Sequence, residues 1–257
     1  MIHDLDWLIQ RYDTVASTMD VAGRFAQLGA RERTVVVSTE QTAGRGRGGR
    51  PWQAPAGSAV FATLILRPRV AANRLSTLPL IAGLAVAEAL ERIAGSAAWL
   101  KWPNDVWLGV DAGFAKVAGV LVTTNLRADT VDHALVGIGI NVLGEVQDLP
   151  LGATTIQAAT GVSVTPTEVL HLLLERFAQA YGAFIAADGR PSLDGWLARA
   201  ALLGEVVTLD EAGGSHSGIF VGVAEDGSLL LQEPGHPIRR VVAGDLVRGP
   251  RVAGNPL

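Results

Sequence analysis

The sequence predicts an α+β protein whose C-terminal end forms a small β domain. Two observations favour this class. Apolar, β-branched runs typical of strands occur together with two long segments of helical periodicity, and only short alternating runs follow Leu203. The chain has 257 residues, 49% of them hydrophobic, and is long enough to bury a large core. We expect one large domain over residues 1–203 and the β domain over residues 204–257.

Apolar runs with many β-branched residues predict four strands in the large domain. They are Thr34–Ser38, Ala59–Leu66, Val117–Val122 and Ala134–Val142. Because several of these runs lack polar residues at alternate positions, we expect the strands to be buried on both faces.

Two segments predict long helices. Ser76–Ala94 carries apolar side chains at helical spacing, and Gly95 follows as a C-cap. The second helix begins after Thr165, which forms a capping box with Glu168 and is followed by a proline at the first helical position. Its apolar positions keep the helical repeat until Asp188-Gly189, where we expect the helix to end.

The C-terminal segment predicts short strands that alternate apolar and polar residues, separated by glycine-rich or polar turns. They are Glu205–Leu209, Ser217–Val223, Ser228–Gln232 and Ile238–Val242. Strands of this length and spacing are typical of a small barrel-like domain.

Charge and composition exclude several classes of protein. The net charge of −4 argues against a protein that coats nucleic acid by overall electrostatic attraction, so any anion site must be local. The chain has no Cys, which excludes disulfides, thiolate metal sites and cysteine nucleophiles. Its N-terminus does not read as a signal peptide, and the apolar run Leu78–Ala87 ends at Glu88, too short to span a membrane. We expect a cytoplasmic protein that binds no membrane.

Residues 44–50 read GRGRGGR and concentrate three arginines and four glycines in one loop. Arginine binds anions through two donors, and glycine lets the backbone fold closely around a ligand, so this composition favours a loop that closes over an anion. The GxGxxG pattern within it does not fit a dinucleotide-binding turn, because the prolines that follow prevent a helix from starting there. An RGG-type nucleic-acid segment and a solvated basic turn remain open alternatives.

Three further segments carry polar residues in unusual places. Residues 100–109 read LKWPNDVWLG, where a turn would present Asn104 and Asp105, although Pro-Asn-Asp is also ordinary turn chemistry. Lys116 leads into an apolar strand in which Gly119 suggests a close approach by a ligand or another backbone. In GIGINV, Asn141 is the polar residue of another strand, and a buried Asn of this kind is often a satisfied core amide.

Together these segments resemble the bacterial biotin protein ligase family. The family's arginine-glycine loop corresponds to Gly44–Trp52, and Gln41 precedes it. The other matching segments follow in the family's order at residues 101–105, 116–121 and 139–141. Ser17-Thr18 is similar to the family's biotin-contact segment, although Met19 stands where the family usually has Asn.

The resemblance covers essentially the whole chain. It implies a class II aminoacyl-tRNA-synthetase-like catalytic domain of the biotin and lipoate ligases, followed by an SH3-like C-terminal domain. Because 16 residues precede Ser17, we expect no helix-turn-helix domain and no DNA binding. The five His residues are scattered without ligand spacing, and we expect no role for them. No sequence feature indicates the oligomeric state.

The resemblance also implies a two-step reaction. The biotin carboxylate attacks the α-phosphate of ATP, with Mg²⁺ present, and biotinyl-5′-AMP and pyrophosphate form. A lysine of the biotin carboxyl carrier domain of a carboxylase then accepts biotin. Of the rivals, a lipoate-protein ligase would differ in the arginine-glycine loop, and a biotin-responsive DNA-binding regulator would need a DNA-reading domain.

In family terms, the site residues fall into three groups. The catalytic candidates are Lys116, Arg47, Arg50 and Asp105. The biotin-binding candidates are Ser17, Thr18, Gln41, Gly44, Arg45, Gly46, Arg47, Lys116 and Gly119. The ATP-binding candidates are Arg50, Trp52, Asn104, Asp105 and Asn141, with Asp105 also the expected Mg²⁺ ligand and Arg248 a further candidate for the nucleotide.

Overall fold

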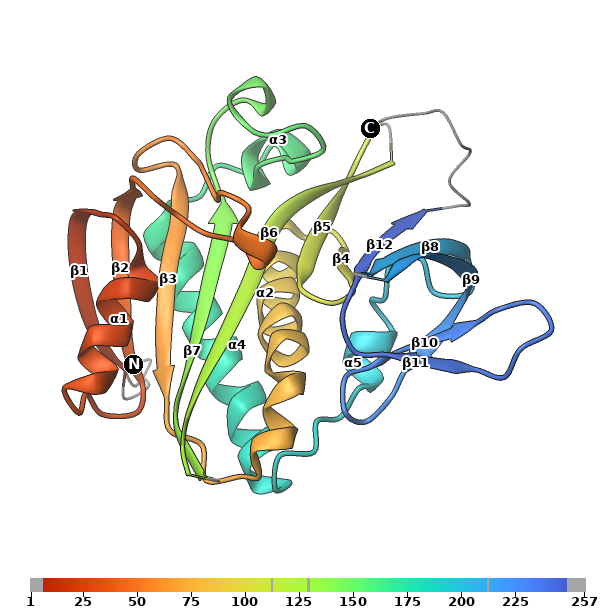
Figure 1. Cartoon of the computed structure of the whole chain (residues 1–257). Helices are drawn as coiled ribbons and strands as arrows, with labels where there is room; N and C mark the ends of the chain where they lie inside the picture. Colours follow the sequence, from red (N-terminus) through yellow and green to blue (C-terminus); the bar gives the residue numbers. More distant parts are fainter. Residues whose placement is uncertain (1–6, 112, 129, 212, 249–257) are drawn as a thin grey trace.

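Two sheets and the helices around them make up the structure, which is a computed structural model describing residues 7–111, 113–128, 130–211 and 213–248 (Figure 1). The larger sheet has seven strands in the order β1-β2-β3-β7-β6-β5-β4. The smaller sheet has five strands in the order β11-β10-β9-β8-β12. This architecture confirms the predicted α+β class with a C-terminal β unit.

The strands of the large sheet are β1 Leu8–Val15, β2 Thr34–Gln41, β3 Ala59–Leu66, β4 Ala98–Lys101, β5 Asp105–Val110, β6 Gly113–Arg127 and β7 Thr130–Asn141. Only β1 and β2 run parallel to each other, and every other neighbouring pair is antiparallel. The four predicted strands are present, and β3 has the predicted bounds. The sequence pattern did not predict β1, β4 or β5.

Helices and short 3₁₀ turns connect these strands. The helices are α1 Thr18–Gln27, α2 Leu78–Ala94, α3 Ile156–Thr160, α4 Pro166–Ala186 and α5 Asp194–Leu197. The 3₁₀ turns are η1 Arg47–Gly49, η2 Ala72–Thr77 and η3 Val146–Asp148. Helix α2 begins two residues after the predicted start at Ser76, because Ser76 belongs to η2. Gly95 is the C-cap of α2, as predicted, with a φ of 64°. The capping box of Thr165 and Glu168 is confirmed.

Helices cover the two faces of the large sheet unequally. Val35 and Leu64 face the core formed with α2 and α4, whereas Val36 and Ile65 face α1 on the other side. The two-residue alternation of a strand explains this division, and it explains why β3 is buried along its whole length. On the face of the sheet where α1 packs against β2 and β3, the segment that contains η1 lies in front of β6 and β7 (Figure 1).

The small sheet consists of β8 Val206–Glu211, β9 Gly214–Val223, β10 Leu229–Gln232, β11 Arg239–Val241 and β12 Asp245–Arg248. All its neighbouring strands are antiparallel, which is consistent with the expected SH3-like domain. Four of these strands were predicted and β12 was not. Trp102 Nε1 donates to the Gly227 carbonyl at 2.9 Å, and Ser76 Oγ donates to the Asp226 carbonyl at 2.8 Å. These bonds hold the small sheet against the large domain.

Among the described residues, no helix is both long and apolar enough to cross a membrane.

Candidate functional site

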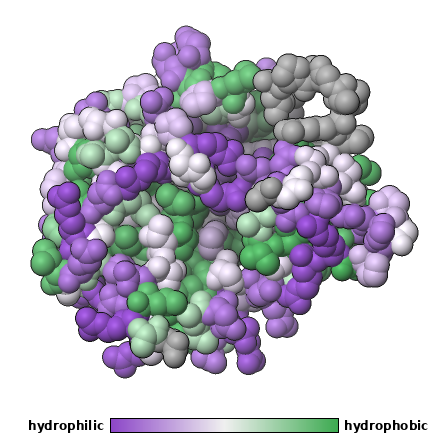
Figure 2. Space-filling view, viewed as in Figure 1, coloured by the Kyte–Doolittle hydropathy of each residue, from purple (hydrophilic) through white to green (hydrophobic). Residues whose placement is uncertain are grey.

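A cavity of about 440 Å³ opens on the face of the large sheet that η1 overlies. Figure 2, which shows the same face, reveals a hollow near its middle where hydrophobic and hydrophilic surface meet. Every site candidate proposed for the described side chains lines this cavity except Gly44. They are Ser17, Thr18, Gln41, Arg45, Gly46, Arg47, Arg50, Trp52, Asn104, Asp105, Lys116, Gly119 and Asn141. The side chain of Arg248 lies outside the part of the chain that the structure describes.

The arginine-glycine loop is a closed hairpin. Trp52 N donates to the Gly44 carbonyl at 2.9 Å, and Gly46 N donates to the Arg50 carbonyl at 2.7 Å. Gly48 and Gly49 make the turn with φ angles of 68° and 76°, which side chains disfavour. A Cβ at Gly44 would overlap the Trp52 carbonyl, so Gly44 is required by the hairpin although it does not line the cavity.

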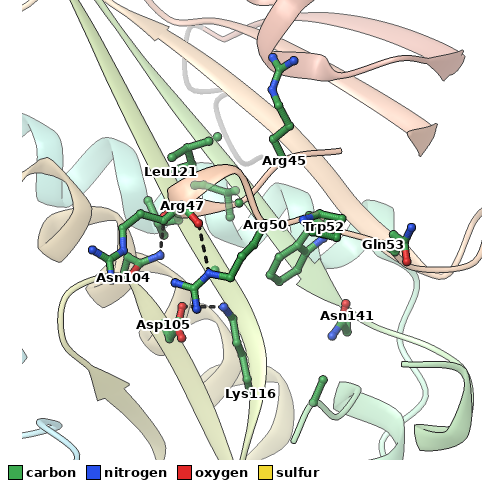
Figure 3. A pocket seen from close by; sticks show the side chains of 18 of the residues that line it. Arg45, Arg47, Arg50, Trp52, Gln53, Asn104, Asp105, Lys116, Leu121 and Asn141 are labelled. Carbon is green, nitrogen blue, oxygen red and sulfur yellow. Dashed lines mark hydrogen bonds and ion pairs between the residues drawn. The ribbon is translucent and has the colours of Figure 1, made fainter. Parts of the chain in front are cut away.

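The three arginines of the hairpin pair with two different carboxylates, and Figure 3 shows the side chain of Arg45 directed away from those of Arg47 and Arg50. Arg45 pairs with Asp20, in the first turn of α1, at 2.5 Å. Arg47 donates to the carboxylate of Asp245 and, at 2.6 Å, to the Gly244 carbonyl. Arg50 also reaches Asp245, at 3.0 Å. Arg47 therefore contacts the small sheet and also lines the cavity.

Asp245 thus links the small sheet to the hairpin. Burial raises the pKa of Asp245, but the nearby charges of Arg47 and Arg50 outweigh burial and hold the pKa below its usual value. Arg47 still keeps a donor free, because its buried Nε makes no hydrogen bond with the described residues. A buried donor without a partner costs free energy, so this position favours a ligand oxygen.

Lys116 and Asp105 form an ion pair in the floor of the cavity, with 2.7 Å between Lys116 Nζ and Asp105 Oδ1. Lys116 is the fourth residue of β6, and Asp105 is the first residue of the neighbouring β5. The Lys116 ammonium also lies 5.3 Å from the centroid of the Trp52 ring. A cation held between a carboxylate and an aromatic face has a fixed position, which suits a charge that must meet a reacting anion.

Two glycines make room for the Trp52 ring. A Cβ at Gly119 would lie 2.9 Å from Trp52 Cζ3, and a Cβ at Gly139 would overlap the indole. The expected close approach at Gly119 is thus made by a side chain. Trp52 Nε1 is buried without a hydrogen-bond partner among the described residues, so it leaves a second open donor in the cavity.

The two asparagines of the site differ in which atoms of their side-chain amides form hydrogen bonds within the protein. Asn104 Nδ2 donates to the Val120 carbonyl at 2.9 Å, which ties the turn before β5 to β6. Asn141 Nδ2 donates to the Thr154 carbonyl at 3.1 Å, but Asn141 Oδ1 is buried and accepts no hydrogen bond from the described residues. The Asn141 nitrogen therefore has a partner in the protein core, whereas the Asn141 oxygen is available to a donor on a ligand.

At the opposite end of the cavity, the N-terminus of α1 meets the end of β2. Gln41 Oε1 accepts hydrogen bonds from Thr18 N at 2.7 Å and from Thr18 Oγ1 at 3.0 Å. This contact fixes the Gln41 amide and leaves its nitrogen for another acceptor. Ser17 is the N-cap of α1, and Met19 lies over Gly137, whose Cβ would be 2.8 Å from the Met19 sulfur.

Sequence reasoning missed several lining residues. Lys101 on β4 and Trp107 on β5 lie within the segment 100–109 that the sequence singled out, but neither was proposed as a site residue. The segment 150–153 reaches the cavity through backbone contacts, because Lys116 N donates to the Gly152 carbonyl at 2.9 Å. Such a backbone contact needs no particular side chain, so it leaves no signal in the sequence.

Comparisons with known proteins cover both parts of the chain. Residues 12–141 match the model of the biotin/lipoate A/B protein ligase family, and residues 202–249 match the biotin protein ligase C-terminal domain. A biotin–[acetyl-CoA-carboxylase] ligase of Paracoccus denitrificans is 40% identical over 77% of this chain and 84% of its own length. A ligase of the same name from Mycobacterium tuberculosis is 30% identical over 93% of this chain and 89% of its own.

A solved structure is similar along nearly the whole chain. The biotin protein ligase of Aquifex aeolicus, in complex with biotin and ATP, superposes with a TM-score of 0.77 at 31% identity. The match covers 94% of this chain and 99% of the Aquifex chain.

Proposed function

The chain belongs to the biotin protein ligase family, and we propose that its pocket joins biotin to ATP and then passes the biotin to a lysine of a carrier protein. The observation that carries this proposal is the charge of the cavity wall. Five basic side chains line the cavity and only one acidic side chain does, within the described residues of a chain whose net charge is −4. A reaction between two anions needs such a local excess of positive charge.

Biotin fits the end of the cavity near α1. There the lining is apolar, through Met19, Ala62, Leu121 and Ile138, and ends in the Thr18–Gln41 contact. An apolar slot with a few fixed polar groups is typical of small-molecule sites. We assign the ureido group of biotin to Gln41 and Thr18, which places the valerate chain toward Lys116.

The carboxylate of biotin and the α-phosphate of ATP then meet beside Lys116. A carboxylate oxygen attacks the α-phosphorus, the bond to the bridging oxygen of the β-phosphate breaks, and its electron pair leaves with pyrophosphate. Lys116, Arg47 and Arg50 offset the repulsion between the two anions and stabilise the charge that spreads over the phosphorus oxygens. The open donors at Arg47 Nε and Trp52 Nε1 and the open acceptor at Asn141 Oδ1 support nucleotide binding along this wall.

The acidic side chain of the cavity fits a magnesium ion that arrives with ATP. Mg²⁺ is usually held by one or two carboxylates together with substrate phosphates, and Asp105 supplies one carboxylate here. The described residues contain no group of three acidic, His or Cys side chains that could hold a metal alone. When bound, Mg²⁺ would neutralise part of the phosphate charge, while Asp105 holds Lys116 in place.

The second step needs no covalent bond to the protein. The neutral amine of the acceptor lysine attacks the carbonyl carbon of biotinyl-5′-AMP, an amide bond forms, AMP leaves with the electron pair of the broken anhydride bond, and the proton that the nitrogen loses passes to water. The closed hairpin of residues 44–52 covers the anhydride and excludes water that would otherwise hydrolyse it. We propose that the acceptor is the biotin carboxyl carrier domain of a carboxylase.

Mass spectrometry of such a carrier domain tests this function. The domain, incubated with the protein, ATP, Mg²⁺ and biotin, should gain the mass of one biotinyl group on one lysine. Parallel incubations with lipoate or octanoate in place of biotin should leave its mass unchanged. Transfer of lipoate but not biotin would overturn the assignment, and a carrier whose acceptor lysine is replaced by Arg provides the control.

A further inference from the structure

Lys101 lies at the end of β4, on the outermost strand of the pocket face. In the sheet, Lys101 is the cross-strand neighbour of Asp105 between β4 and β5, and Trp107 is the cross-strand neighbour of Lys116 between β5 and β6. The Lys101 ammonium lies 5.2 Å from the centroid of the Trp107 ring. These four side chains all line the cavity, so three neighbouring strands present two ammonium groups on either side of one carboxylate.

Lys101 differs from the other basic residues of the cavity in having no carboxylate partner. Arg45 pairs with Asp20, Lys116 pairs with Asp105, and both Arg47 and Arg50 pair with Asp245. Lys101 forms no ion pair with any residue that the structure describes, and its ammonium rests on the Trp107 ring instead. The cavity therefore holds one cation whose charge is not yet matched.

Burial makes this unmatched cation costly. Burial lowers the pKa of Lys101 and the charges of Lys116 and Arg50 lower it further, while the carboxylates of Asp105 and Asp245 restore only part of the shift. A half-buried ammonium has lost some of its hydration, and an aromatic face replaces that hydration only in part. An anion that binds beside Lys101 would supply the missing partner.

The order of the strands indicates which anion this is. Gly137 and Met19, at the proposed biotin end, belong to β7 and α1, whereas Lys116 and Asp105 occupy β6 and β5. Lys101 on β4 lies one strand further along the same direction. A linear arrangement of biotin, α-phosphate and leaving group, as an in-line displacement requires, places the leaving group at β4.

We propose that Lys101 binds the β- and γ-phosphates of ATP and stabilises the pyrophosphate that leaves when biotin is activated, an inference that rests on the proposed ligase function. As the carboxylate oxygen bonds to the α-phosphorus, the electron pair of the broken P–O bond moves onto the pyrophosphate, and the Lys101 ammonium offsets that added charge. No proton transfer is needed. Lys101 has no part in the second step, because pyrophosphate has left before the acceptor lysine reacts.

The two half-reactions separate this role from a merely structural one. For Lys101→Met we expect kcat/KM for ATP, measured by biotin-dependent pyrophosphate release, to fall about a hundredfold, the usual effect of losing one group that stabilises the transition state. Transfer from supplied biotinyl-5′-AMP to the carrier domain should stay within about twofold of the parent rate, a difference near 0.4 kcal/mol. Lys101→Arg, which keeps the charge, should recover most of the first activity.

Binding of inorganic pyrophosphate gives a readout independent of turnover. Calorimetric titration should show affinity in the parent and in Arg240→Met, a control that removes a cation of β11 paired with Asp226 at 2.9 Å, and a loss of at least tenfold in Lys101→Met. Equal loss of both half-reactions, or unchanged pyrophosphate affinity, would overturn the role of Lys101. A parent protein that releases no pyrophosphate with biotin and ATP would instead contradict the ligase function itself.

Discussion

Replacing Asp245 by Asn tests how the small sheet holds the arginine-glycine hairpin. In the parent, one carboxylate of β12 accepts hydrogen bonds from both Arg47 and Arg50. Asn keeps the shape of the side chain but removes its charge. The hairpin should then remain folded through its own backbone bonds, while its attachment to the small sheet weakens.

The exposure of the three side chains sets the size of the effect. Arg47 is 28% exposed, Asp245 is 45% exposed and Arg50 is 64% exposed, so water screens both pairs, and the Arg50 pair more strongly. Solvent-exposed ion pairs contribute about 0.2–1 kcal/mol each. We therefore expect Asp245→Asn to lower the free energy of unfolding by about 1 kcal/mol and to speed dissociation of biotinyl-5′-AMP about fivefold.

The effect should also depend on pH. Because Arg47 and Arg50 hold the pKa of Asp245 below its usual value in the folded protein, the ion pairs stabilise the fold fully above the unfolded pKa of about 3.9. That contribution disappears as the pH falls through the lower pKa of the folded state. The difference in stability between the parent and Asp245→Asn should therefore be largest at neutral pH and shrink in acid.

Urea unfolding at several pH values and stopped-flow dissociation of the adenylate measure these effects. Asp13→Asn is the control, because Asp13 is exposed on β1 and makes no ion pair with a described residue. Unchanged adenylate dissociation in Asp245→Asn, together with unchanged stability at pH 7, would refute the idea that Asp245 attaches the hairpin.

Three further substitutions test other parts of the account. Lys116→Ala should reduce formation of biotinyl-5′-AMP by a factor of about 10²–10³ in a rapid-quench assay, because it removes the cation nearest the reacting oxygens; parent-like rates would contradict this role. Gly139→Ala should weaken ATP binding at least tenfold in calorimetric titration, since its methyl group displaces the Trp52 ring, whereas Gly109→Ala, which meets open space, should bind ATP like the parent. Thr165→Ala should lower the free energy of unfolding by about 1 kcal/mol in urea through loss of the N-cap bond to Glu168 N, and activity at low temperature should not change.

Local sequence signals were sufficient for the elements that bury their side chains in regular patterns. β3 is apolar at every position and has the predicted bounds, and α4 begins at the capping box of Thr165. β1 gave no such signal, because its residues alternate irregularly between exposed and half-buried. β4 and β5 are short and flank the Trp102 turn, and their pairing depends on partners elsewhere in the sheet.

The site likewise combines features that the sequence marks locally with contacts that depend on distant parts of the chain. The composition of the hairpin predicted an anion-binding loop, and the resemblance supplied thirteen of the residues that line the cavity as site candidates. No sequence pattern indicated that Asp245, about 200 residues away, holds Arg47, or that Trp52 fills the space above Gly119 and Gly139. Contacts of this kind depend on how the small sheet packs on the large domain, which local patterns do not encode.

The most direct test of the central claim, that one cationic pocket joins biotin to ATP, is a quench experiment without carrier protein. The parent protein, mixed with biotin, ATP and Mg²⁺, should accumulate biotinyl-5′-AMP bound to the protein and release an equal amount of pyrophosphate, and both products should require biotin. Release of pyrophosphate without biotin, or formation of an adenylate from lipoate but none from biotin, would contradict the account.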